Sequence, residues 1–221
     1  DLYLQDVVML QKYFKGRLKI YPHKYSSTEE LMGQSKDLIG SITSPKLSEI
    51  IQFTLLWSDN LLAARLAQMS ARQQGFTADS AGIQMSFEKM LREMDIPTEG
   101  LVFKDGAGLS HDNRVTADSV VRLLKYIHTT SEMNVIYSGL PTSGETGTLK
   151  NRFKKDAPSA IGLVHAKTGW INTTVSLAGF VEAGDQQFVF AVIASGLPSR
   201  ESYRANARVA IDKLLACLLY T

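Results

Sequence analysis

Two tripeptides in the sequence contain the residue types of an acyl-transfer site. They are Ser-Asp-Asn at positions 58–60 and Lys-Thr-Gly at positions 167–169. An acyl-transfer site needs a nucleophilic serine, a proton shuttle, a group that binds the substrate carboxylate, and donors for an oxyanion. The hydroxyl and amide of the first string and the ammonium and hydroxyl of the second could supply the proton shuttle and the binding groups.

Five of the six residues in the two strings have a candidate role. The Ser58 hydroxyl could relay a proton, and the Asn60 amide could anchor a substrate amide. Lys167 supplies positive charge, Thr168 offers a donor to a carboxylate, and Gly169 lets a substrate lie against the strand backbone. If these roles are correct, the side-chain tips of Ser58 and Lys167 must meet within hydrogen-bond reach or across one water.

A purely structural interpretation competes with this one. Residues 58–60 could be a plain helix cap and residues 167–169 the end of a hairpin. Either tripeptide alone is a weak signal, because short strings occur by chance. The two together, in this order, are two of the three signature strings of the penicillin-binding proteins and class A β-lactamases, the third being Ser-x-x-Lys.

Other candidate sites are weaker. The histidines have no metal-ligand spacing, so we expect neither a metal nor a cofactor; they are His23, His111, His128 and His165. His165 shares a strand face with Lys167, but ordinary packing or solvent exposure is the favoured interpretation. The glycine-containing stretch 139–147 is followed by no Gly-Lys-Ser/Thr and is not a phosphate loop. Lys154 and Lys155 are expected on a solvated face.

Hydrophobic periodicity predicts helices over the first part of the chain. A helix at 2–15 should lead into a polar connector at 22–37. Ser44 is the expected cap of a helix over Leu47–Trp57, with Pro45 at its first position. Further helices are expected from Asn60 toward Gly75, from a cap at Thr77 or Ser80 through Met94, and after a cap at Thr116, with an ordered loop at 98–115 between the last two.

The periodicity changes to that of strands after a loop at 138–160. Strands are predicted at 161–168, 174–182 and 188–194, with a turn at Gly184–Asp185 and a final amphipathic helix over 203–218. The 174–182 strand should present Val175, Leu177, Gly179 and Val181 on one face. The last strand is continuously apolar, as in a strand covered on both sides. The fold class is therefore α+β, a helical cluster plus an antiparallel sheet with a C-terminal helix.

Composition narrows the function classes. The chain has 221 residues, is 44% hydrophobic, and carries a formal net charge of +2, which does not suggest a nucleic-acid partner. No apolar run reaches the roughly 18 residues of a membrane span. The one cysteine, Cys217, excludes an intramolecular disulfide and is expected on an apolar helix face. Because the chain begins at Asp1 rather than Met, we expect a processed chain or a fragment.

Over nearly its whole length the sequence resembles the D-alanyl-D-alanine carboxypeptidase/endopeptidases, the class C low-molecular-weight penicillin-binding proteins. Beyond the two tripeptides, three segments carry the resemblance. They are the Ser-Pro-Lys-Leu-Ser-Glu-Ile string at 44–50, the loop 105–116 with Asp-Gly-Ala-Gly-Leu-Ser and Asn-Arg-Val-Thr, and Gly147–Thr148–Leu149 with Arg152.

The resemblance implies an incomplete domain of β-lactamase/transpeptidase-like fold. Residues 1–43 would be the end of an inserted domain and a connector, and residues 44–221 the C-terminal part of the transpeptidase-like domain. Ser58, Asn60 and Lys167 would be catalytic, and residues 168–170 would bind substrate. The implied enzyme acts outside the cytoplasm on peptidoglycan stem peptides through an acyl-serine, and β-lactams acylate it.

The sequence departs from the family at two points. The residue after Lys-Thr-Gly is usually Thr or Ser, and here it is Trp170, which keeps a backbone N–H for the oxyanion but lacks the hydroxyl. In addition, no Ser-x-x-Lys string stands upstream of Ser58, where the family carries its nucleophile; Thr43–Lys46 gives only Thr-x-x-Lys. We therefore expect a missing N-terminal segment of the same protein, an inactive chain, and an exposed apolar patch where that segment docks.

Two other functions stay open from the sequence. One is a non-catalytic peptidoglycan- or protein-binding module that keeps the pocket without the nucleophile. The other is a β-lactamase of the same fold, which would hydrolyse a chromogenic cephalosporin at high turnover. A Ser-x-x-Lys string upstream in the reading frame would separate the enzyme from the binding module.

Overall fold

The computed structural model describes residues 44–130 and 134–220. By its internal contacts the chain divides into two units, 1–44 and 45–221. The helix expected at 2–15 and the connector at 22–37 lie outside the described residues. The assignment of residues 1–43 to an inserted domain stays a prediction.

Helices form the first half of the second unit, much as the periodicity predicts. They are α3 (Leu47–Trp57), α4 (Asn60–Gln73), α5 (Ser80–Glu93), α6 (Ala117–Thr129) and the short α7 (Asn134–Gly139). The segment between α5 and α6 is an ordered loop, closed by an antiparallel bridge between Val102 and Arg114.

The first helix spans Leu47–Trp57 as predicted, but its cap lies two residues later than expected. The predicted cap at Ser44 is wrong, because the N-cap residue of α3 is Lys46 and Pro45 stands before the cap. The carboxylate of Glu49 accepts the Lys46 backbone N–H at 3.2 Å, which satisfies a donor at the helix start.

The predicted cap of α5 is wrong, and the predicted cap of α6 is confirmed. The N-cap residue of α5 is Asp79, not Thr77 or Ser80; the Thr77 hydroxyl donates to the Asp79 carboxylate at 2.7 Å and so supports the cap. Thr116 caps α6 as predicted, accepting the Ser119 N–H at 3.0 Å.

The second half of the unit is a three-stranded antiparallel sheet in the order β1-β2-β3. Its strands are β1 (Val164–Ile171), β2 (Thr174–Ala183) and β3 (Gln186–Ala194), and Gly184–Asp185 forms the tight turn before β3. The helix α8 (Glu201–Cys217) follows, as expected. No helix among the described residues is long and apolar enough to cross a bilayer.

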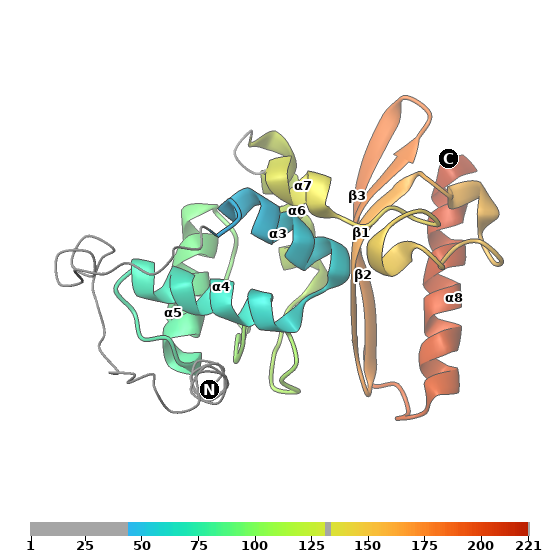
Figure 1. The fold of residues 1–221 in the computed structure, drawn as a ribbon. Coiled ribbons are helices and arrows are strands. Elements are labelled where there is room, and N and C mark those ends of the chain that lie inside the picture. The colour runs from blue at the N-terminus through green and yellow to red at the C-terminus, as the bar shows by residue number, and fades with distance from the viewer. Residues whose placement is uncertain (1–43, 131–133, 221) are drawn as a thin grey trace, which may run out of the picture. The chain divides into compact units, whose positions relative to one another are not determined.

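Both faces of β2 are buried, because helices cover the sheet on two sides (Figure 1). Val175, Leu177 and Val181 lie on the predicted common face and belong to a core with Ile211 and Leu215 of α8. On the opposite face, Phe180 packs in a second cluster with residues of α6 and the segment after α7, namely Leu124, Ile127 and Leu140. The sheet is thus the middle layer between the helical cluster and α8.

Two burial expectations are corrected. The prediction that the strand at 188–194 is covered on both sides is wrong at its start, since the Phe188 side chain is exposed. Within the described sheet, β3 is an edge strand paired only with β2. Cys217 is exposed at the end of α8 rather than on an apolar face.

Candidate active site

The first tripeptide is a turn between two helices. Ser58 ends α3 in the left-handed region, with φ 56° and ψ 47°. Asp59 then begins α4, its carboxylate accepting the Leu62 N–H at 2.9 Å. Asn60, the first residue of α4, lines the adjoining cleft. The helix-cap interpretation is therefore correct for Asp59, and the same cap holds Ser58 and Asn60 in fixed positions on either side of it.

The second tripeptide meets this turn from the sheet. The Lys167 Nζ on β1 donates to the Ser58 Oγ at 2.5 Å and to the Thr168 carbonyl at 2.7 Å. The expectation that these side chains meet across 109 positions of sequence is confirmed. Burial lowers the pKa of Lys167 to about 8, because an ammonium loses hydration there. Lys167 is therefore held where it can influence the proton of Ser58.

The Thr168 hydroxyl has a partner that sequence reasoning did not name as a site residue. It donates to the Thr148 hydroxyl at 3.0 Å, and Thr148 lies in the short 3₁₀ helix η2 (Gly147–Leu149). A Cβ at Gly147, whose φ is 49°, would lie 2.3 Å from the Leu56 carbonyl oxygen of α3. The glycine thus allows this turn to pack on α3. The signal was the Gly-Thr-Leu segment, which the family resemblance had singled out without a role.

Gly169 has a reason to be glycine within the fold itself. A Cβ there would lie 2.4 Å from the Ser176 hydroxyl on β2, the residue that faces it in the strand pair. The next residue, Trp170, is 61% exposed and lines the cleft. The Arg204 guanidinium of α8 lies 5.7 Å from the centre of a Trp170 ring, within cation–π range. The indole is therefore backed by a cation and open to the cleft.

These residues line one open cleft with a volume of 1380 Å³. Small-ligand pockets are typically about 300–1,000 Å³, so this cleft is larger than most of them. The first wall of the cleft is formed by both tripeptides and their neighbours, namely Ser58, Asn60, Thr148, Lys167, Thr168, Gly169 and Trp170. The loop before α6 forms the second wall.

The loop opposite β1 is organised by Asp105. Its carboxylate accepts the backbone N–H groups of residues 107–110, with distances from 2.5 to 3.1 Å, and the Asn113 amide at 3.1 Å. Burial raises the pKa of Asp105, but these hydrogen bonds outweigh it and the net pKa is lowered. An ionised Asp105 therefore fixes the shape of this wall.

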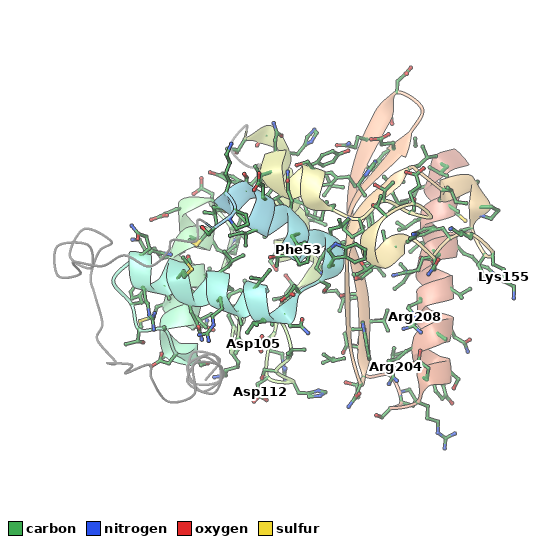
Figure 2. All side chains as sticks on the ribbon, viewed as in Figure 1. Phe53, Asp105, Asp112, Lys155, Arg204 and Arg208 are labelled. Atoms are coloured by element: carbon green, nitrogen blue, oxygen red, sulfur yellow. The ribbon has the colours of Figure 1, made fainter. Side chains whose placement is uncertain are left out.

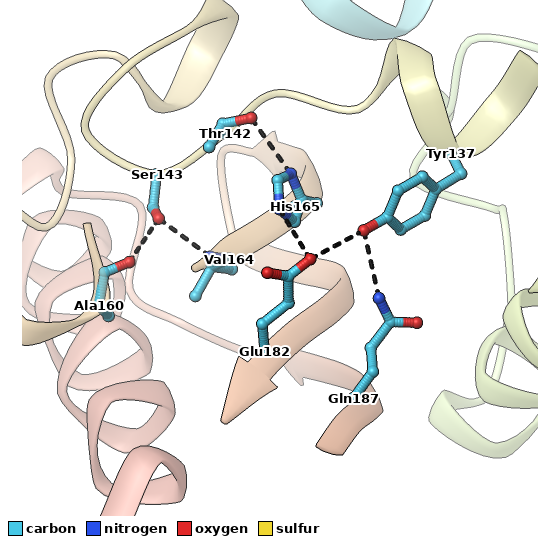
Figure 3. A network of polar contacts seen from close by, with 8 residues as sticks. All are labelled: Tyr137, Thr142, Ser143, Ala160, Val164, His165, Glu182 and Gln187. Carbon is cyan, nitrogen blue, oxygen red and sulfur yellow. Dashed lines mark hydrogen bonds and ion pairs between the residues drawn. The ribbon is translucent and has the colours of Figure 1, made fainter. Parts of the chain in front are cut away.

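His165 belongs to a separate polar network at the other end of β1 (Figure 3). Its Nδ1 lies 3.2 Å from the Thr142 hydroxyl and its Nε2 3.5 Å from Glu182. Tyr137 donates to Glu182 at 3.2 Å, and its ring packs on the imidazole with centroids 5.6 Å apart. The favoured interpretation of His165 as a packing residue is confirmed. Among the described residues, no group of three His, Cys, Asp or Glu could hold a metal ion.

Sequence reasoning overlooked one Ser-x-x-Lys string, at Ser86–Lys89 in α5. The Ser86 side chain is completely buried and receives a hydrogen bond from the Gln74 amide at 2.7 Å. Lys89 instead lies on the exposed side of α5 and pairs with Glu93 at 4.0 Å. Neither residue lines the cleft, so this string does not supply a nucleophile to it.

Similarity to known proteins agrees with this geometry. The chain is 33% identical over 172 residues to a D-alanyl-D-alanine carboxypeptidase of Actinomadura sp. (strain R39), covering 74% of this chain and 31% of that protein. It is 33% identical over 186 residues to the carboxypeptidase DacB of Mycolicibacterium smegmatis, covering 81% of this chain and 39% of that one. The chain thus spans about a third of the length of the curated relatives it matches.

Solved structures confirm the fold. Penicillin-binding protein 4 (dacB) of Haemophilus influenzae superposes with a TM-score of 0.70 at 24% identity, over 78% of this chain and 41% of that one. The TLA-3 extended-spectrum β-lactamase superposes with a TM-score of 0.58 at 18% identity, over 90% and 72%. The expected β-lactamase/transpeptidase-like fold is therefore correct. Residues 23–218 match the family described as D-Ala-D-Ala carboxypeptidase 3 (S13), and the chain belongs to that family.

Proposed function

We propose that this chain forms part of the active site of a serine-type D-Ala-D-Ala carboxypeptidase/endopeptidase that acts on peptidoglycan stem peptides. The observation that carries the proposal is the hydrogen bond from Lys167 to Ser58 at 2.5 Å, in a cleft that Asn60 and Thr168 also line. Because peptidoglycan lies outside the cytoplasmic membrane, the proposed location is extracytoplasmic.

The proposed reaction passes through an acyl-serine. The nucleophilic serine oxygen bonds to the carbonyl carbon of the penultimate D-Ala, the C–N bond to the last residue breaks, and the serine proton passes to the leaving amine. Ser58 would relay that proton beside Lys167, and the Trp170 backbone N–H would donate to the oxyanion. Water then releases the peptide. A β-lactam would acylate the same serine when its ring amide opens.

We further propose that the nucleophile comes from a segment of the same protein upstream of this chain. The supporting observations are that no Ser-x-x-Lys string precedes Ser58, that Ser86 is buried, and that the match covers only 31% to 39% of the relatives' own length. In addition, α3 carries exposed apolar side chains and β3 presents an edge on which a further strand could pair.

Mass spectrometry after incubation with penicillin G tests both proposals. The protein from the full reading frame should gain one covalent adduct, and replacing its upstream nucleophilic serine with Ala should abolish the adduct. The isolated chain should gain no adduct. The Ser86→Ala variant of the isolated chain should give the same result. An adduct on the isolated chain would contradict the missing nucleophile.

Two other results would favour the alternative functions, a non-catalytic binding module or a β-lactamase. Binding of a D-Ala-D-Ala peptide by the full-length protein without any adduct would identify a non-catalytic binding module. Rapid turnover of a chromogenic cephalosporin, with the acyl-enzyme detected only transiently, would identify a β-lactamase. Either result would overturn the carboxypeptidase proposal.

A further inference from the structure

In the part of the chain that the structure describes, four Lys or Arg side chains line the cleft, and three of them already have partners within the protein. They are Lys167, Arg114, Arg152 and Arg208. Lys167 donates to Ser58 and to a backbone carbonyl. Arg152 is paired with Asp212 at 2.5 Å, with both side chains largely buried. Arg114 donates to the backbone carbonyls of His111 and Asn113 in its own loop.

The fourth cation is Arg208 of α8, and its ion-pair partner is an exposed carboxylate. Within the described residues its guanidinium donates to Glu201, whose side chain is 62% exposed. Glu201 also accepts two hydrogen bonds from Arg204, at 2.7 and 3.0 Å. One carboxylate therefore serves two guanidinium groups, and this end of the cleft keeps an excess positive charge. An exposed ion pair of this kind contributes little and can be exchanged for another carboxylate.

Two contacts hold the part of α8 that carries Arg208 against the end of β1 and the segment after Thr148. Arg204, one helical turn earlier on the same face of α8, lies over Trp170 and donates to the Asn172 carbonyl at 3.0 Å. The backbone carbonyl of Arg208 accepts a hydrogen bond from Arg152 at 3.5 Å, in the segment that follows Thr148. Both arginines extend from the side of α8 that faces the sheet (Figure 2).

The same corner of the cleft is short of donors for an anion. Thr168 offers one hydroxyl proton, which it shares with Thr148, and Trp170 brings no hydroxyl. Two of the three Lys167 protons are already used. A carboxylate has about four acceptor positions, and the planar fork of an arginine matches its two oxygens.

We propose that Arg208 binds the C-terminal carboxylate of the peptide substrate, beside the hydroxyl of Thr168. The proposal rests on the proposed function, because it assigns a partner to the free carboxylate that a D-Ala-D-Ala peptide carries. Before substrate binds, Glu201 holds the guanidinium at the cleft. On binding, the substrate carboxylate replaces Glu201 as the partner of Arg208, and Glu201 keeps Arg204.

A pair of peptides tests this in the full-length protein with its upstream nucleophilic serine replaced by Ala, so that neither peptide is cleaved during the measurement. One ends in D-Ala-D-Ala with a free carboxylate, and the other is the same peptide with a C-terminal carboxamide. Arg208→Met should weaken binding of the free acid, measured by calorimetry, by about 10- to 100-fold, the scale of a charged hydrogen bond. Binding of the carboxamide should change less than about threefold. Arg208→Lys should be intermediate, because it keeps charge without the fork.

Lys213→Met is the matched control, since it removes one positive charge from an exposed position of the same helix outside the cleft. It should leave both affinities unchanged. Equal losses for acid and carboxamide in Arg208→Met, or no loss for either, would overturn the proposal. If Arg208→Met does not fold, the acid-to-carboxamide ratio of Arg208→Lys decides. Because affinity is measured, the result stands apart from the penicillin adduct, whose absence would count only against the proposed function.

Discussion

A side chain at position 58 carries a conformational cost, because the backbone there is left-handed. Its φ of 56° lies in the left-handed region, where residues with a Cβ are disfavoured by roughly 1–2 kcal/mol relative to glycine. The position joins α3 to α4, so a glycine would make the same turn more easily. The hydroxyl, which Lys167 contacts, distinguishes serine from glycine here.

Ser58→Gly should therefore separate stability from function. We expect the free energy of unfolding to be unchanged or higher by up to about 1 kcal/mol, because glycine relieves the left-handed strain. Acylation of the full-length protein by penicillin G should fall about 10²-fold or more, as for loss of a positioned proton-transfer group. Chemical denaturation and stopped-flow kinetics measure the two effects. Full activity in a stable Ser58→Gly protein would refute the role of the hydroxyl.

Lys167 is the second residue whose replacement should affect the chemistry directly. Lys167→Ala should lower acylation efficiency of the full-length protein by about 10²-fold or more, the scale of a lost electrostatic contact. Lys167→Arg should restore only part of it, since a wide planar guanidinium does not replace a compact ammonium. Lys125→Ala, at an exposed position on α6, is the control and should have no effect. An unchanged rate in Lys167→Ala would refute its role.

The lowered pKa of Lys167 predicts the direction of the pH dependence. With a pKa of about 8, the group is charged at neutral pH and loses its proton as the pH rises through 8. If the charge assists acylation, efficiency should fall over that range, and Lys167→Arg should lose this fall because its guanidinium stays charged. Acylation rates between pH 6 and 10 measure it. A rise through pH 8 would instead indicate that the neutral amine accepts a proton from Ser58.

At the scale of elements, one helix cap fixes the geometry of the first tripeptide. The Asp59 carboxylate caps α4 through the Leu62 N–H at 2.9 Å, and its neighbours on both sides point into the site. The Asp79 carboxylate caps α5 in the same way, through the Gly82 N–H at 2.9 Å, away from the cleft. The two caps are chemically alike and differ in what they position.

Replacing each cap by alanine should expose this difference. Asp59→Ala and Asp79→Ala should each lower the free energy of unfolding by about 1 kcal/mol, the usual cost of losing such a cap. Only Asp59→Ala should also slow acylation of the full-length protein, because α4 then frays beside Ser58 and Asn60. Denaturation curves and acylation rates of the two variants test this together. Equal acylation rates would show that the cap does not position the site.

At the scale of the whole molecule, α3 is too apolar for a surface helix. Its side chains include exposed Phe53 and Trp57, and Leu61 follows at the exposed start of α4. Such a cluster is typical of a surface that another segment covers. It adjoins the Ser58 turn, so a segment docked there would lie next to the cleft.

The double variant Phe53→Gln/Trp57→Gln tests this surface. In the isolated chain it should reduce binding of a hydrophobic dye and leave stability within about 0.5 kcal/mol, as for exposed positions. In the full-length protein it should lower the melting temperature, because the covering segment loses its contacts. Leu214→Gln, at an exposed position of α8, is the control for both measurements. An unchanged melting temperature of the full-length double variant would argue against docking on α3.

The sequence alone predicted most of the helices and strands and singled out the two tripeptides as site residues. Helix α4 begins at Asn60 and strand β2 at Thr174 as predicted, because caps and hydrophobic periodicity depend on near neighbours. The motif chemistry also predicted that Ser58 and Lys167 meet, and their hydrogen bond agrees with it. Only the tertiary structure decided the other contacts of the site. The Thr148 partner of Thr168 and the position of Arg208 depend on the packing of the sheet between α3 and α8. Contacts between distant residues leave no local pattern, so periodicity does not predict them.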